Sequence, residues 1–393
     1  MKVILINTLY HPFKVGGAEL SVQALAEKLN EMGVITGIIT LGKQDDACEV
    51  NGVKIWRIKI ENIFWPFEEE EKSSLQKLRW HYNDVVNNSY KDKINTILNQ
   101  FKPDIINTNN LSGFSVSIWE LFKNKKIKIV HTLRDYYLIC PKTTKYKKGK
   151  TCTQTCLECG LLSYLKKRAS HKVDAVVGIS EYILNKHNEH GFFKNAKKSI
   201  QVNGFDLKNS ISRPIIFGDH TQLRLGFIGQ INKTKGIELL LQTLSHFNSY
   251  NNWELHVAGK ISESQKSKLN RFQLNEKLKF TGYIEQKHFF DKINVLIVPS
   301  IWEEPFGRVV LEGLINGKVV LASNKGGLKE LLKNNTQFIF EPNEKELKKL
   351  IGAILNKPTK LNLFKHENTF INQFSLTKSA KEYQKLFCEM IEE

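Results

Sequence analysis

The sequence predicts an α/β protein built from two doubly wound parallel sheets, one in each half of the chain. Short apolar runs of strand length alternate with amphipathic stretches of helix length, and this alternation stops once and then restarts. The runs are apolar throughout, as expected for parallel strands buried on both faces. A chain of 393 residues is too long for one ordinary core and sufficient for two domains.

The first half contains one clear helix and five strand-like runs. Residues 18–31 are interpreted as the helix, because Leu20, Ala24, Leu25 and Leu29 recur at helical spacing. The strands are expected at Val3–Asn7, Ile35–Leu41, Ile105–Asn107, Ile127–Thr132 and Ala175–Ile179.

A turn-rich stretch then interrupts the pattern, from Asn203-Gly204 through Arg213-Pro214 to Gly218. We therefore predict one domain over residues 1–205 and another over 206–375. The second contains a helix near 237–247, and a final amphipathic helix is expected within 376–393. The strands of the second domain are expected at Leu223–Gly229, Trp253–Ala258, Leu278–Thr281, Val295–Pro299 and Val319–Ala322.

The composition limits the class of protein. No stretch approaches the roughly 20 apolar residues that span a bilayer. The N-terminal MKVILIN runs directly into a strand without a cleavage site, so a cytoplasmic location is expected. The formal charge is +18, with the densest excess between Lys142 and Lys172, where only Glu158 is acidic. This excess of positive charge forms either a solvated lysine-rich surface or a surface that attracts anionic lipid or nucleic acid.

The most informative segment is Pro299-Ser-Ile-Trp-Glu-Glu-Pro-Phe-Gly-Arg-Val-Val-Leu-Glu312-Gly. A buried strand is expected to end at its start, and a helix to begin near Pro305–Gly307, where proline costs no hydrogen bond. The amides of Gly307, Arg308 and Val309 would then form a positive helix terminus suited to a diphosphate.

Two glutamates flank this expected terminus. Glu304 precedes it and Glu312 lies within the helix. A carboxylate accepts hydrogen bonds from two vicinal hydroxyls, so one glutamate can hold a hexose and the other a ribose. The segment therefore predicts a nucleotide-sugar site.

Four of the six cysteines are bunched at Cys140, Cys152, Cys156 and Cys159. Four thiolates at short spacing could hold a structural zinc ion. The alternative is a set of reduced structural thiols, because the spacing differs from that of paired Cys-x2-Cys zinc knuckles.

These motifs together resemble family 4 of the retaining glycosyltransferases, which have the GT-B fold. The donor-site signature is Glu304-x7-Glu312 with Pro-Phe-Gly at 305–307, followed by Asn324-Lys-Gly-Gly327-x-x-Glu330. The resemblance continues through the whole chain. The other segments that resemble the family are Gly16-Gly17-Ala18-Glu19, Ser180-Glu181, Asn203-Gly204-Phe205-Asp206, Gly229, Lys235-Gly236 and Phe374-Ser375.

The resemblance implies a role for each domain and for matching residues. Residues 1–205 would form the acceptor-side domain, on which helix 376–393 packs back, and residues 206–375 would bind the donor. Lys235 would pair with the diphosphate and stabilise the leaving group, while Glu304 binds the transferred sugar and Glu312 the ribose. The donor would also contact Gly16, Gly17, Gly229, Gln230, Phe306, Gly307, Arg308 and Val309.

The sequence departs from the family pattern at two positions. Gln230 stands where relatives usually have an arginine, so a neutral side chain replaces one of the cations near the diphosphate. Arg134 stands where many relatives have a histidine that contacts the donor sugar. Arg134 and His131 are therefore alternative candidates for a catalytic residue beside Glu304 and Lys235.

The predicted function is metal-independent transfer of a hexose-type sugar, with retention, from a UDP- or GDP-sugar to a saccharide or lipid-linked acceptor. Retention by covalent catalysis needs a nucleophilic carboxylate, and the sequence offers no evident candidate, so front-face attack is favoured. The setting expected is polysaccharide or lipopolysaccharide synthesis, peripheral at the inner face of the cytoplasmic membrane. No cofactor is expected to be needed for catalysis.

Other classes of protein fit less well. A dehydrogenase would need Gly-x-Gly-x-x-Gly after the first strand, whereas Gly16-Gly17 comes late. An epimerase with the GT-B fold lacks support from the Glu304 and Glu312 motif. A basic nucleic-acid-binding protein would explain the charge, but no binding motif is present, and carboxylates would repel phosphates.

Overall fold

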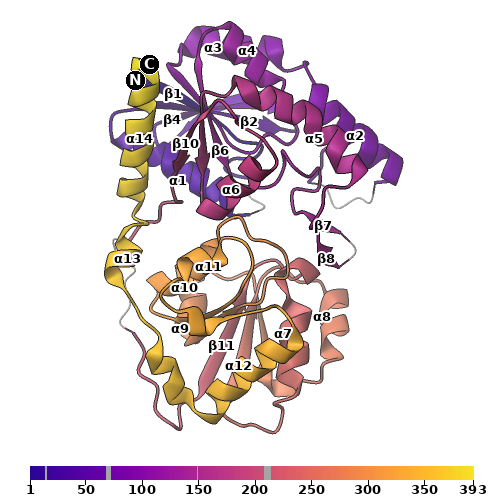
Figure 1. The fold of residues 1–393 in the computed structure, drawn as a ribbon, viewed down its shortest axis with the longest axis vertical. Coiled ribbons are helices and arrows are strands. Elements are labelled where there is room, and N and C mark those ends of the chain that lie inside the picture. Colours follow the sequence, from indigo (N-terminus) through magenta and orange to yellow (C-terminus); the bar gives the residue numbers. More distant parts are fainter. Residues whose placement is uncertain (14–15, 68–71, 148, 208–213) are drawn as a thin grey trace. The chain divides into compact units, whose positions relative to one another are not determined.

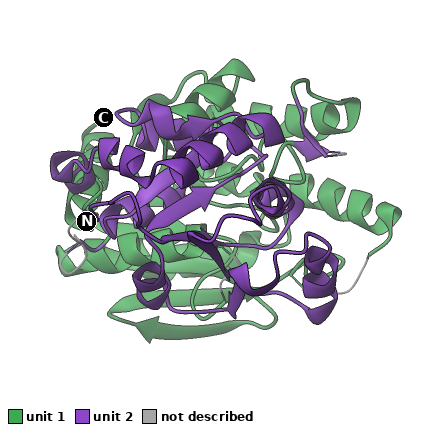
Figure 2. Ribbon diagram, turned by 90° about the horizontal axis from the view of Figure 1, so that it is seen from below, with its two compact units in different colours: residues 1–145, 153–205, 374–393 green, residues 146–152, 206–373 purple. Residues whose placement is uncertain are grey.

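The computed structural model describes residues 1–13, 16–67, 72–147, 149–207 and 214–393 (Figure 1). The chain forms two compact units (Figure 2). Unit 1 comprises Met1–Lys145, Thr153–Phe205 and Phe374–Glu393, and unit 2 comprises Tyr146–Cys152 and Asp206–Gln373. The short segment Tyr146–Cys152 thus belongs with unit 2, whereas the sequence boundaries placed it in the first domain.

Unit 1 is built on a sheet with the strand order β10-β9-β6-β5-β1-β2-β4-β3. All neighbouring strands are parallel except β3, which pairs antiparallel with β4. The strand order reverses between β1 and β5, which makes their carboxyl ends a binding position in doubly wound folds. The strands are β1 (Lys2–Ile6), β2 (Ile35–Gly42), β3 (Asp46–Val50), β4 (Val53–Lys59), β5 (Ile105–Thr108), β6 (Lys128–Leu133), β9 (Ala175–Gly178) and β10 (Lys197–Ile200).

Helices connect and cover these strands, and the last helix of the chain returns to them (Figure 1). The helices are α1 (Gly17–Glu31), α2 (Ser74–Val86), α3 (Lys91–Phe101), α4 (Ile118–Asn124), α5 (Leu157–Ala169), α6 (Glu181–Glu189) and α14 (Leu376–Glu392). On α14, the buried side chains of Ala380, Tyr383 and Phe387 join the core cluster that includes Leu25 of α1 and Val3 of β1. The apolar stripe predicted for the tail is therefore buried in unit 1.

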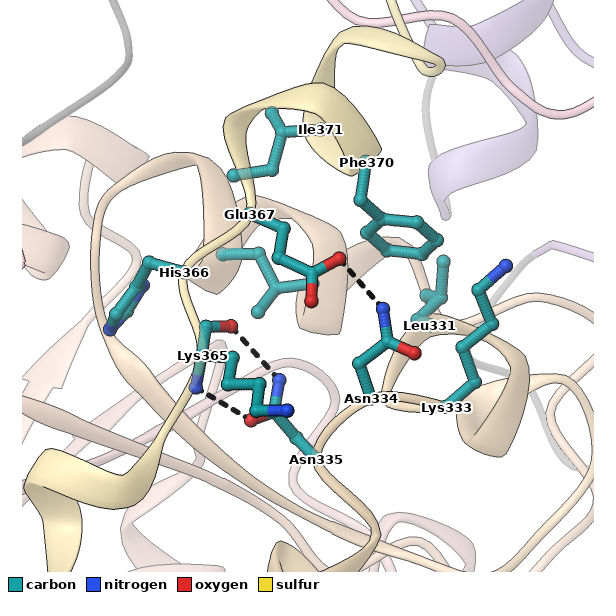
Figure 3. Close-up of a pocket in the computed structure, with 10 residues that line it drawn as sticks. Leu331, Lys333, Asn334, Asn335, Lys365, His366, Glu367, Phe370 and Ile371 are labelled. Carbon is teal, nitrogen blue, oxygen red and sulfur yellow. Dashed lines mark hydrogen bonds between the residues drawn. The ribbon is translucent and has the colours of Figure 1, made fainter.

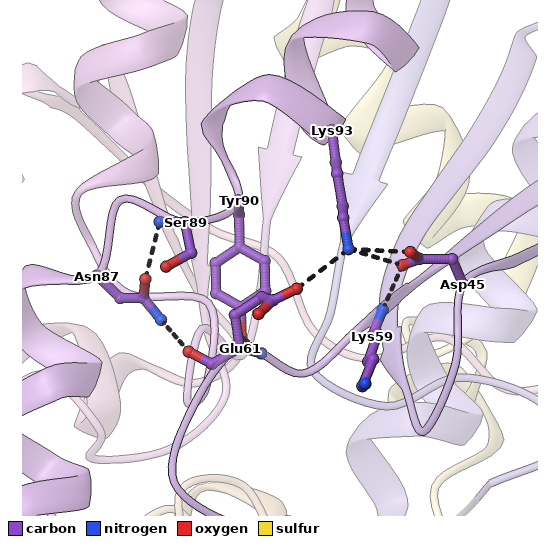
Figure 4. Close-up of polar contacts among 7 residues, drawn as sticks. All are labelled: Asp45, Lys59, Glu61, Asn87, Ser89, Tyr90 and Lys93. Atoms are coloured by element: carbon purple, nitrogen blue, oxygen red, sulfur yellow. Dashed lines mark hydrogen bonds and ion pairs between the residues drawn. The ribbon is translucent and has the colours of Figure 1, made fainter.

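A network of polar contacts, with ion pairs at the surface and a buried tyrosine behind them, fixes the chain between β4 and α3 (Figure 4). Lys93 of α3 forms ion pairs with Asp45, at 2.9 Å, and with Glu61, at 3.1 Å. The backbone amide of Glu61 donates to the Tyr90 hydroxyl, and the Asn87 side chain donates to the Glu61 carbonyl. Surface ion pairs contribute little stability, so this network mainly orients the segment that leads to α2.

Unit 2 has a parallel sheet with the strand order β13-β12-β11-β14-β15-β16. The order reverses between β11 and β14, which predicts a binding position at their carboxyl ends. The strands are β11 (Leu223–Ile228), β12 (Trp253–Ala258), β13 (Leu278–Gly282), β14 (Val295–Val298), β15 (Val319–Ser323) and β16 (Ile339–Phe340), with a separate hairpin of β7 (Tyr146–Lys147) and β8 (Lys150–Thr151). The helices are α7 (Ile237–Ser245), α8 (Glu263–Asn270), α9 (Gln286–Lys292), α10 (Arg308–Ile315), α11 (Leu328–Leu331), α12 (Glu344–Asn356) and α13 (Asn368–Asn372).

The predicted fold class is confirmed: both halves contain a parallel, doubly wound sheet. Each predicted strand is present, with ends that differ by at most one residue, as is usual at element boundaries. The sequence analysis did not identify β3, β4 or the pair of helices α2 and α5. Among the described residues, no helix has both the length and the apolar character required to cross a membrane.

Candidate functional site

The candidate donor site of unit 2 is formed by three loops, which follow β11, β14 and β15. These strands are neighbours in the sheet, so their carboxyl ends lie at one edge. The loops carry Lys235, Glu304 and Gly326 respectively. The motif residues, although far apart in the sequence, are thereby brought to the edge where the strand order reverses.

Glu304 is the centre of this site. Its side-chain oxygen Oε1 accepts hydrogen bonds from Lys235 Nζ at 2.7 Å, Ser300 Oγ at 2.7 Å and Trp302 Nε1 at 3.0 Å. The Lys235 ammonium also lies 5.1 Å from the centre of the Trp302 ring. Three donors on one oxygen fix the carboxylate in one orientation, and Oε2 takes no part in these three bonds. The roles of Ser300 and Trp302 were not predicted from the sequence, although both residues stand in the motif.

The loop that carries Lys235 is fastened to the loop that carries Glu304. The carbonyl of Thr234 accepts the backbone amide of Ile301 at 2.8 Å. Gly236 has φ 76°, and a Cβ at this position would lie 1.8 Å from the Pro299 carbonyl oxygen. Only glycine permits this approach, which explains the Lys-Gly pair in physical terms.

The third loop supports Glu304 through its backbone. The Gly327 amide donates to the Glu304 carbonyl at 2.8 Å. A Cβ on Gly326, which has φ 62°, would lie 2.1 Å from that same carbonyl oxygen. The Asn-Lys-Gly-Gly motif therefore contacts the backbone of Glu304 and sets the position of this glutamate.

Helix α10 begins at Arg308, after Gly307, which has φ 108°. The prediction of a helix start near Pro305–Gly307 was thus close to the observed start. Phe306 is buried, whereas Arg308 and Val309 are half-buried. The first amides of a helix have no acceptor within the helix and carry a partial positive charge, so they suit a phosphate.

Glu312 lies on α10 and is buried. Its Oε1 accepts a hydrogen bond from Arg308 Nε at 2.8 Å, one helical turn away. Its Oε2 is buried with no hydrogen-bond partner within the described part of the chain. Burial raises the pKa of Glu312, which Arg308 and Gln286 offset in part. A buried carboxylate oxygen of this kind is suited to accept a ligand hydroxyl.

Gly229 and Gln230 follow β11. Gly229 has φ 144°, and no protein atom among the described residues would obstruct a Cβ there. Gln230 is exposed, and its side-chain oxygen accepts a bond from Asn232. Asn232 also caps the turn that carries Lys235, by accepting its backbone amide at 3.1 Å.

In unit 1, Arg134 directly follows β6 and is buried. Its Nε donates to Asn109 Oδ1 at 2.7 Å and its terminal nitrogen to Asn203 Oδ1 at 2.6 Å. The neighbouring Asp135 accepts the Tyr137 amide, and burial raises the pKa of Asp135 to about 6. Two amide oxygens hold the guanidinium at the carboxyl edge of the sheet. Neither partner was predicted from the sequence.

His131 points into the interior of unit 1, on β6. Its ring stacks on Phe193, with ring centres 5.6 Å apart, and meets the edge of Trp119 at 5.2 Å. Its Nδ1 is 2.9 Å from the Thr108 hydroxyl. Burial lowers the pKa of His131 to about 3. These surroundings favour a packing role, and we therefore leave His131 out of the proposed mechanism.

Gly16 and Gly17 stand at the start of α1. The Gly16 amide donates to Glu19 Oε2 at 2.9 Å, which closes a capping contact. That amide is engaged in the structure, so a phosphate at this position would have to displace the Glu19 carboxylate. The other role predicted for the glycine loop, close backbone approach to the donor, stays a prediction.

The cysteines of the cluster are reduced. In unit 1, burial raises the pKa of Cys159, and the Cys156 and Cys140 thiols hydrogen-bond to it and raise it further. Cys152 belongs to unit 2. In the described ranges, no group of three or more His, Cys, Asp or Glu side chains has an arrangement that could hold a metal ion. The zinc site therefore stays a prediction.

A small pocket elsewhere in unit 2 does not contribute to the candidate site (Figure 3). Its polar groups bond to one another: Asn334 donates to Glu367 at 2.7 Å, and Asn335 pairs with the Lys365 backbone. Its lining comes from the end of α10 and the approach to α13, and it also includes Leu331, Lys333, His366, Phe370 and Ile371.

Comparisons with known proteins support the interpretation of the motifs. The family model described as Glycosyltransferase Family 4 matches residues 15–209, and the model described as Glycosyl transferases group 1 matches residues 210–372. A 42.6 kDa protein in the cps region of Klebsiella pneumoniae is 38% identical over 336 residues, which cover 84% of this chain and 87% of that protein. The lipopolysaccharide 1,2-N-acetylglucosaminetransferase of Salmonella typhimurium is 34% identical over 119 residues, which cover 27% of this chain and 31% of that enzyme.

Solved structures share the fold. Sucrose-phosphate synthase from Thermosynechococcus elongatus has a TM-score of 0.77 and 19% identity, over 99% of this chain and 98% of that chain. The Anabaena protein HepE, in complex with UDP-glucose, has a TM-score of 0.71 and 16% identity, over 99% of this chain and all of that chain. At these identities the likeness establishes the fold, which is the predicted GT-B fold.

Proposed function

We propose, from the premise that this chain belongs to family 4 of the glycosyltransferases, that it transfers a hexose-type sugar from a nucleotide sugar to a saccharide or lipid-linked saccharide. The family makes the chain a glycosyltransferase. The observation that carries the finer proposal is the convergence of Lys235, Ser300 and Trp302 on Glu304 Oε1. A carboxylate held this firmly can bind sugar hydroxyls in one orientation.

The donor is a UDP- or GDP-sugar held by the loops of unit 2. Glu304 accepts hydrogen bonds from the hydroxyls of the transferred sugar, and Glu312 Oε2 accepts one from the ribose. The first amides of α10 face the diphosphate. Lys235 pairs with Glu304 and is half-buried. Its ammonium has three hydrogens, so it can keep this contact, donate also to the diphosphate and stabilise the charge on the leaving group.

The transfer retains the configuration at the anomeric carbon. A double displacement would require a carboxylate nucleophile on the face of the sugar opposite the leaving group, whereas the two carboxylates of the site are assigned to the hydroxyls of the sugar (Glu304) and of the ribose (Glu312). We therefore favour attack from the face that the leaving group departs from. The bond from the anomeric carbon to the donor phosphate breaks, the bond to the acceptor oxygen forms, and the acceptor proton passes to a phosphate oxygen.

Catalysis needs no metal ion, because an ammonium and a helix terminus supply the positive charge at the diphosphate. The reaction belongs to the synthesis of a cell-surface polysaccharide or lipopolysaccharide. Support for this setting comes from the relative in a cps region and from the relative that acts on lipopolysaccharide. We place it at the inner face of the cytoplasmic membrane, with the protein peripheral to the bilayer.

A panel of UDP- and GDP-sugars tests the proposal. The purified full chain is incubated with each donor without an acceptor, and slow release of the nucleoside diphosphate is measured. One or a few donors should be hydrolysed, because water replaces the acceptor at a preorganised site. Failure of the folded protein to hydrolyse or bind any donor would refute the proposal, and inversion at the anomeric carbon would refute the mechanism.

A further inference from the structure

Large hydrophobic side chains are exposed on two neighbouring helices of unit 1. Helices α2 and α5 pack against each other (Figure 1). Of the 17 large hydrophobic side chains exposed among the described residues, eight lie on these two helices. Single exposed apolar residues are ordinary, whereas a concentration of this kind indicates an interaction site. We call these eight the α2–α5 apolar surface: Leu75, Leu78, Tyr82, Val86, Leu157, Leu161, Tyr164 and Leu165.

On α5 the exposed side chains form one stripe. Leu157 is 90% exposed and Leu161 is 76% exposed. At 100° per residue, these two, Tyr164 and Leu165 fall within an arc of about 100°. The buried residue of this helix is Lys166, which lies on the opposite side. The helix therefore turns its leucines to the outside and a lysine to the inside.

Helix α2 has the same arrangement. Leu75 is 79% exposed, and it shares an arc of about 80° with Leu78, Tyr82 and Val86. Asp84 is fully buried on the opposite side of the helix. The helix also buries Trp80 and Val85, so its inward face is mixed. An ordinary surface helix turns its apolar residues towards the core, whereas both of these helices bury a charged residue and leave four large apolar side chains outside.

The buried charges are held by specific contacts. Lys166 Nζ donates to the Tyr137 carbonyl at 2.9 Å and lies 3.3 Å from the centre of the Tyr137 ring. Asp84 Oδ1 accepts the Gly113 amide at 2.5 Å. Burial raises the pKa of Asp84 to about 6 and lowers that of Lys166 to about 8, and their mutual attraction opposes both shifts. These contacts fix the inward charged side chains, and the eight side chains of the α2–α5 apolar surface are exposed.

Basic side chains accompany the apolar surface. On α2 the exposed Arg79 lies beside the apolar arc, whereas the exposed Lys77 lies across the helix from it. On α5 the exposed Arg168 lies within the arc, and Lys167 is half-buried to one side of it. The acidic residue on these two exposed faces is Glu158. The run of glutamates at 68–71, which precedes α2, lies outside the described residues. A two-fold contact between copies would place like charges face to face, whereas an anionic lipid surface complements them.

We propose that α2 and α5 dock the protein on an anionic membrane, with the α2–α5 apolar surface inserted among the lipid head groups and the flanking lysines and arginines against lipid phosphates. Amphipathic helices that lie in the plane of a membrane combine these features: an apolar face at the boundary of the acyl chains and cationic residues beside it. The proposal is independent of the donor site, because it uses other residues and another measurement. It specifies which part of the chain meets the bilayer.

This interpretation differs from attraction by net charge alone. Within Lys142–Lys172, Lys145 and Lys166 are buried, and Lys172 is paired with Glu120. The charge available to a membrane is therefore smaller than the sequence count. Salt screens the part of the binding that arises from charge, while the part that arises from the apolar surface persists.

Flotation of the full chain with lipid vesicles tests the proposal. The vesicles contain phosphatidylcholine alone or mixed with phosphatidylglycerol. The double variant Leu157→Gln/Leu161→Gln should lower the partition coefficient about 100-fold, or tenfold for each leucine that no longer enters the lipid. Leu75→Gln/Leu78→Gln should have a similar effect. The control is Ile216→Gln/Leu363→Gln in unit 2, where residues 87% and 65% exposed are replaced.

The control should bind vesicles like the wild type, and all variants should hydrolyse the donor normally in solution, because none touches the donor site. Loss of donor hydrolysis with normal flotation would therefore concern the proposed function alone. Equal partition of the leucine variants and the wild type would overturn the docking proposal. So would the absence of vesicle binding, or a dimer in sedimentation velocity that these variants convert to monomer.

Discussion

Replacement of Glu304 by glutamine removes the charge at the centre of the donor site and leaves its shape intact. The amide keeps an oxygen that can accept bonds from Ser300 and Trp302, but it loses the ion pair with Lys235, which is 2.7 Å long. It also loses the capacity to accept two hydroxyls with full charge. We expect turnover of the donor to fall by about 100-fold or more.

The magnitude follows from the contacts. A hydrogen bond to a charged group contributes about 1.5–3 kcal/mol, and a neutral one about 1 kcal/mol. Weakening two hydroxyl contacts in the transition state therefore removes about 3 kcal/mol, which corresponds to roughly 100-fold in rate. The loss of stability should be small, at most about 1 kcal/mol, because Lys235 is half-exposed and solvent screens the pair.

The assay is steady-state donor hydrolysis, with thermal unfolding measured in parallel. Glu254→Gln is the control: Glu254, like Glu304, is a paired carboxylate, with His256 and Lys279 as partners, but it is half-buried and lies near the start of β12. The control should keep normal turnover. If folded Glu304→Gln turned over the donor at a rate close to that of the wild type, the role assigned to Glu304 would be wrong.

Three further predictions concern unit 1 and metals. Arg134→Ala should lower donor turnover about 10- to 1000-fold. Arg134→Lys should restore little of it, because Asn109 and Asn203 bind the planar guanidinium, which lysine lacks. Normal turnover of folded Arg134→Ala would make Arg134 structural. His131 and His187, whose pKa values burial lowers to about 3, stay neutral in the folded state. In the unfolded chain both histidines take up a proton below about pH 6.5. The free energy of unfolding in urea should therefore fall between pH 6.5 and 4, by about 1.4 kcal/mol per pH unit for each histidine. His131→Gln should reduce this slope, while His220→Gln, at an exposed position, should not. Chelation of divalent metals should leave turnover intact, and turnover restored only by added metal would contradict this. If the Cys140–Cys159 set holds a structural zinc ion, elemental analysis should return about one zinc per chain; a metal-free protein with freely titrating thiols would leave the alternative of reduced structural thiols.

The sequence predicted those features that depend on local patterns. Buried parallel strands are continuous apolar runs, so Val295–Pro299 and Trp253–Ala258 were found within a residue of β14 and β12. The helix start after Gly307 was predicted from proline and glycine. The pairing of Lys235 with Glu304 was not predicted, because it joins loops 69 residues apart. The resemblance brought both residues to one site, but gave no contact between them.

Other features depend on burial, which a single sequence does not specify. His131 stands at a strand end in the sequence, and only the packing of Trp119 and Phe193 shows that it faces the interior. Helices α2 and α5 illustrate the same limit. Their exposed leucines have the spacing of an ordinary buried stripe, whereas the structure buries Lys166 on α5 and Asp84, beside Trp80 and Val85, on α2. Periodicity identifies a helix and its faces, but the neighbouring elements decide which face turns inward.

The position of Glu304 is set by contacts between backbone atoms of the protein, and these contacts do not depend on a bound ligand. Gly236 packs on the Pro299 carbonyl before the glutamate, and Gly326 packs on the carbonyl of Glu304 itself. A side chain at either glycine would meet backbone, which cannot move without displacing the loop. The carboxylate is then oriented by Ser300 and Trp302 of its own loop. A catalytic group acts efficiently only when its geometry is fixed before the reaction. The two glycine motifs and the glutamate motif therefore act together: the glycines allow the backbone segments to pack closely, and the glutamate supplies the charge.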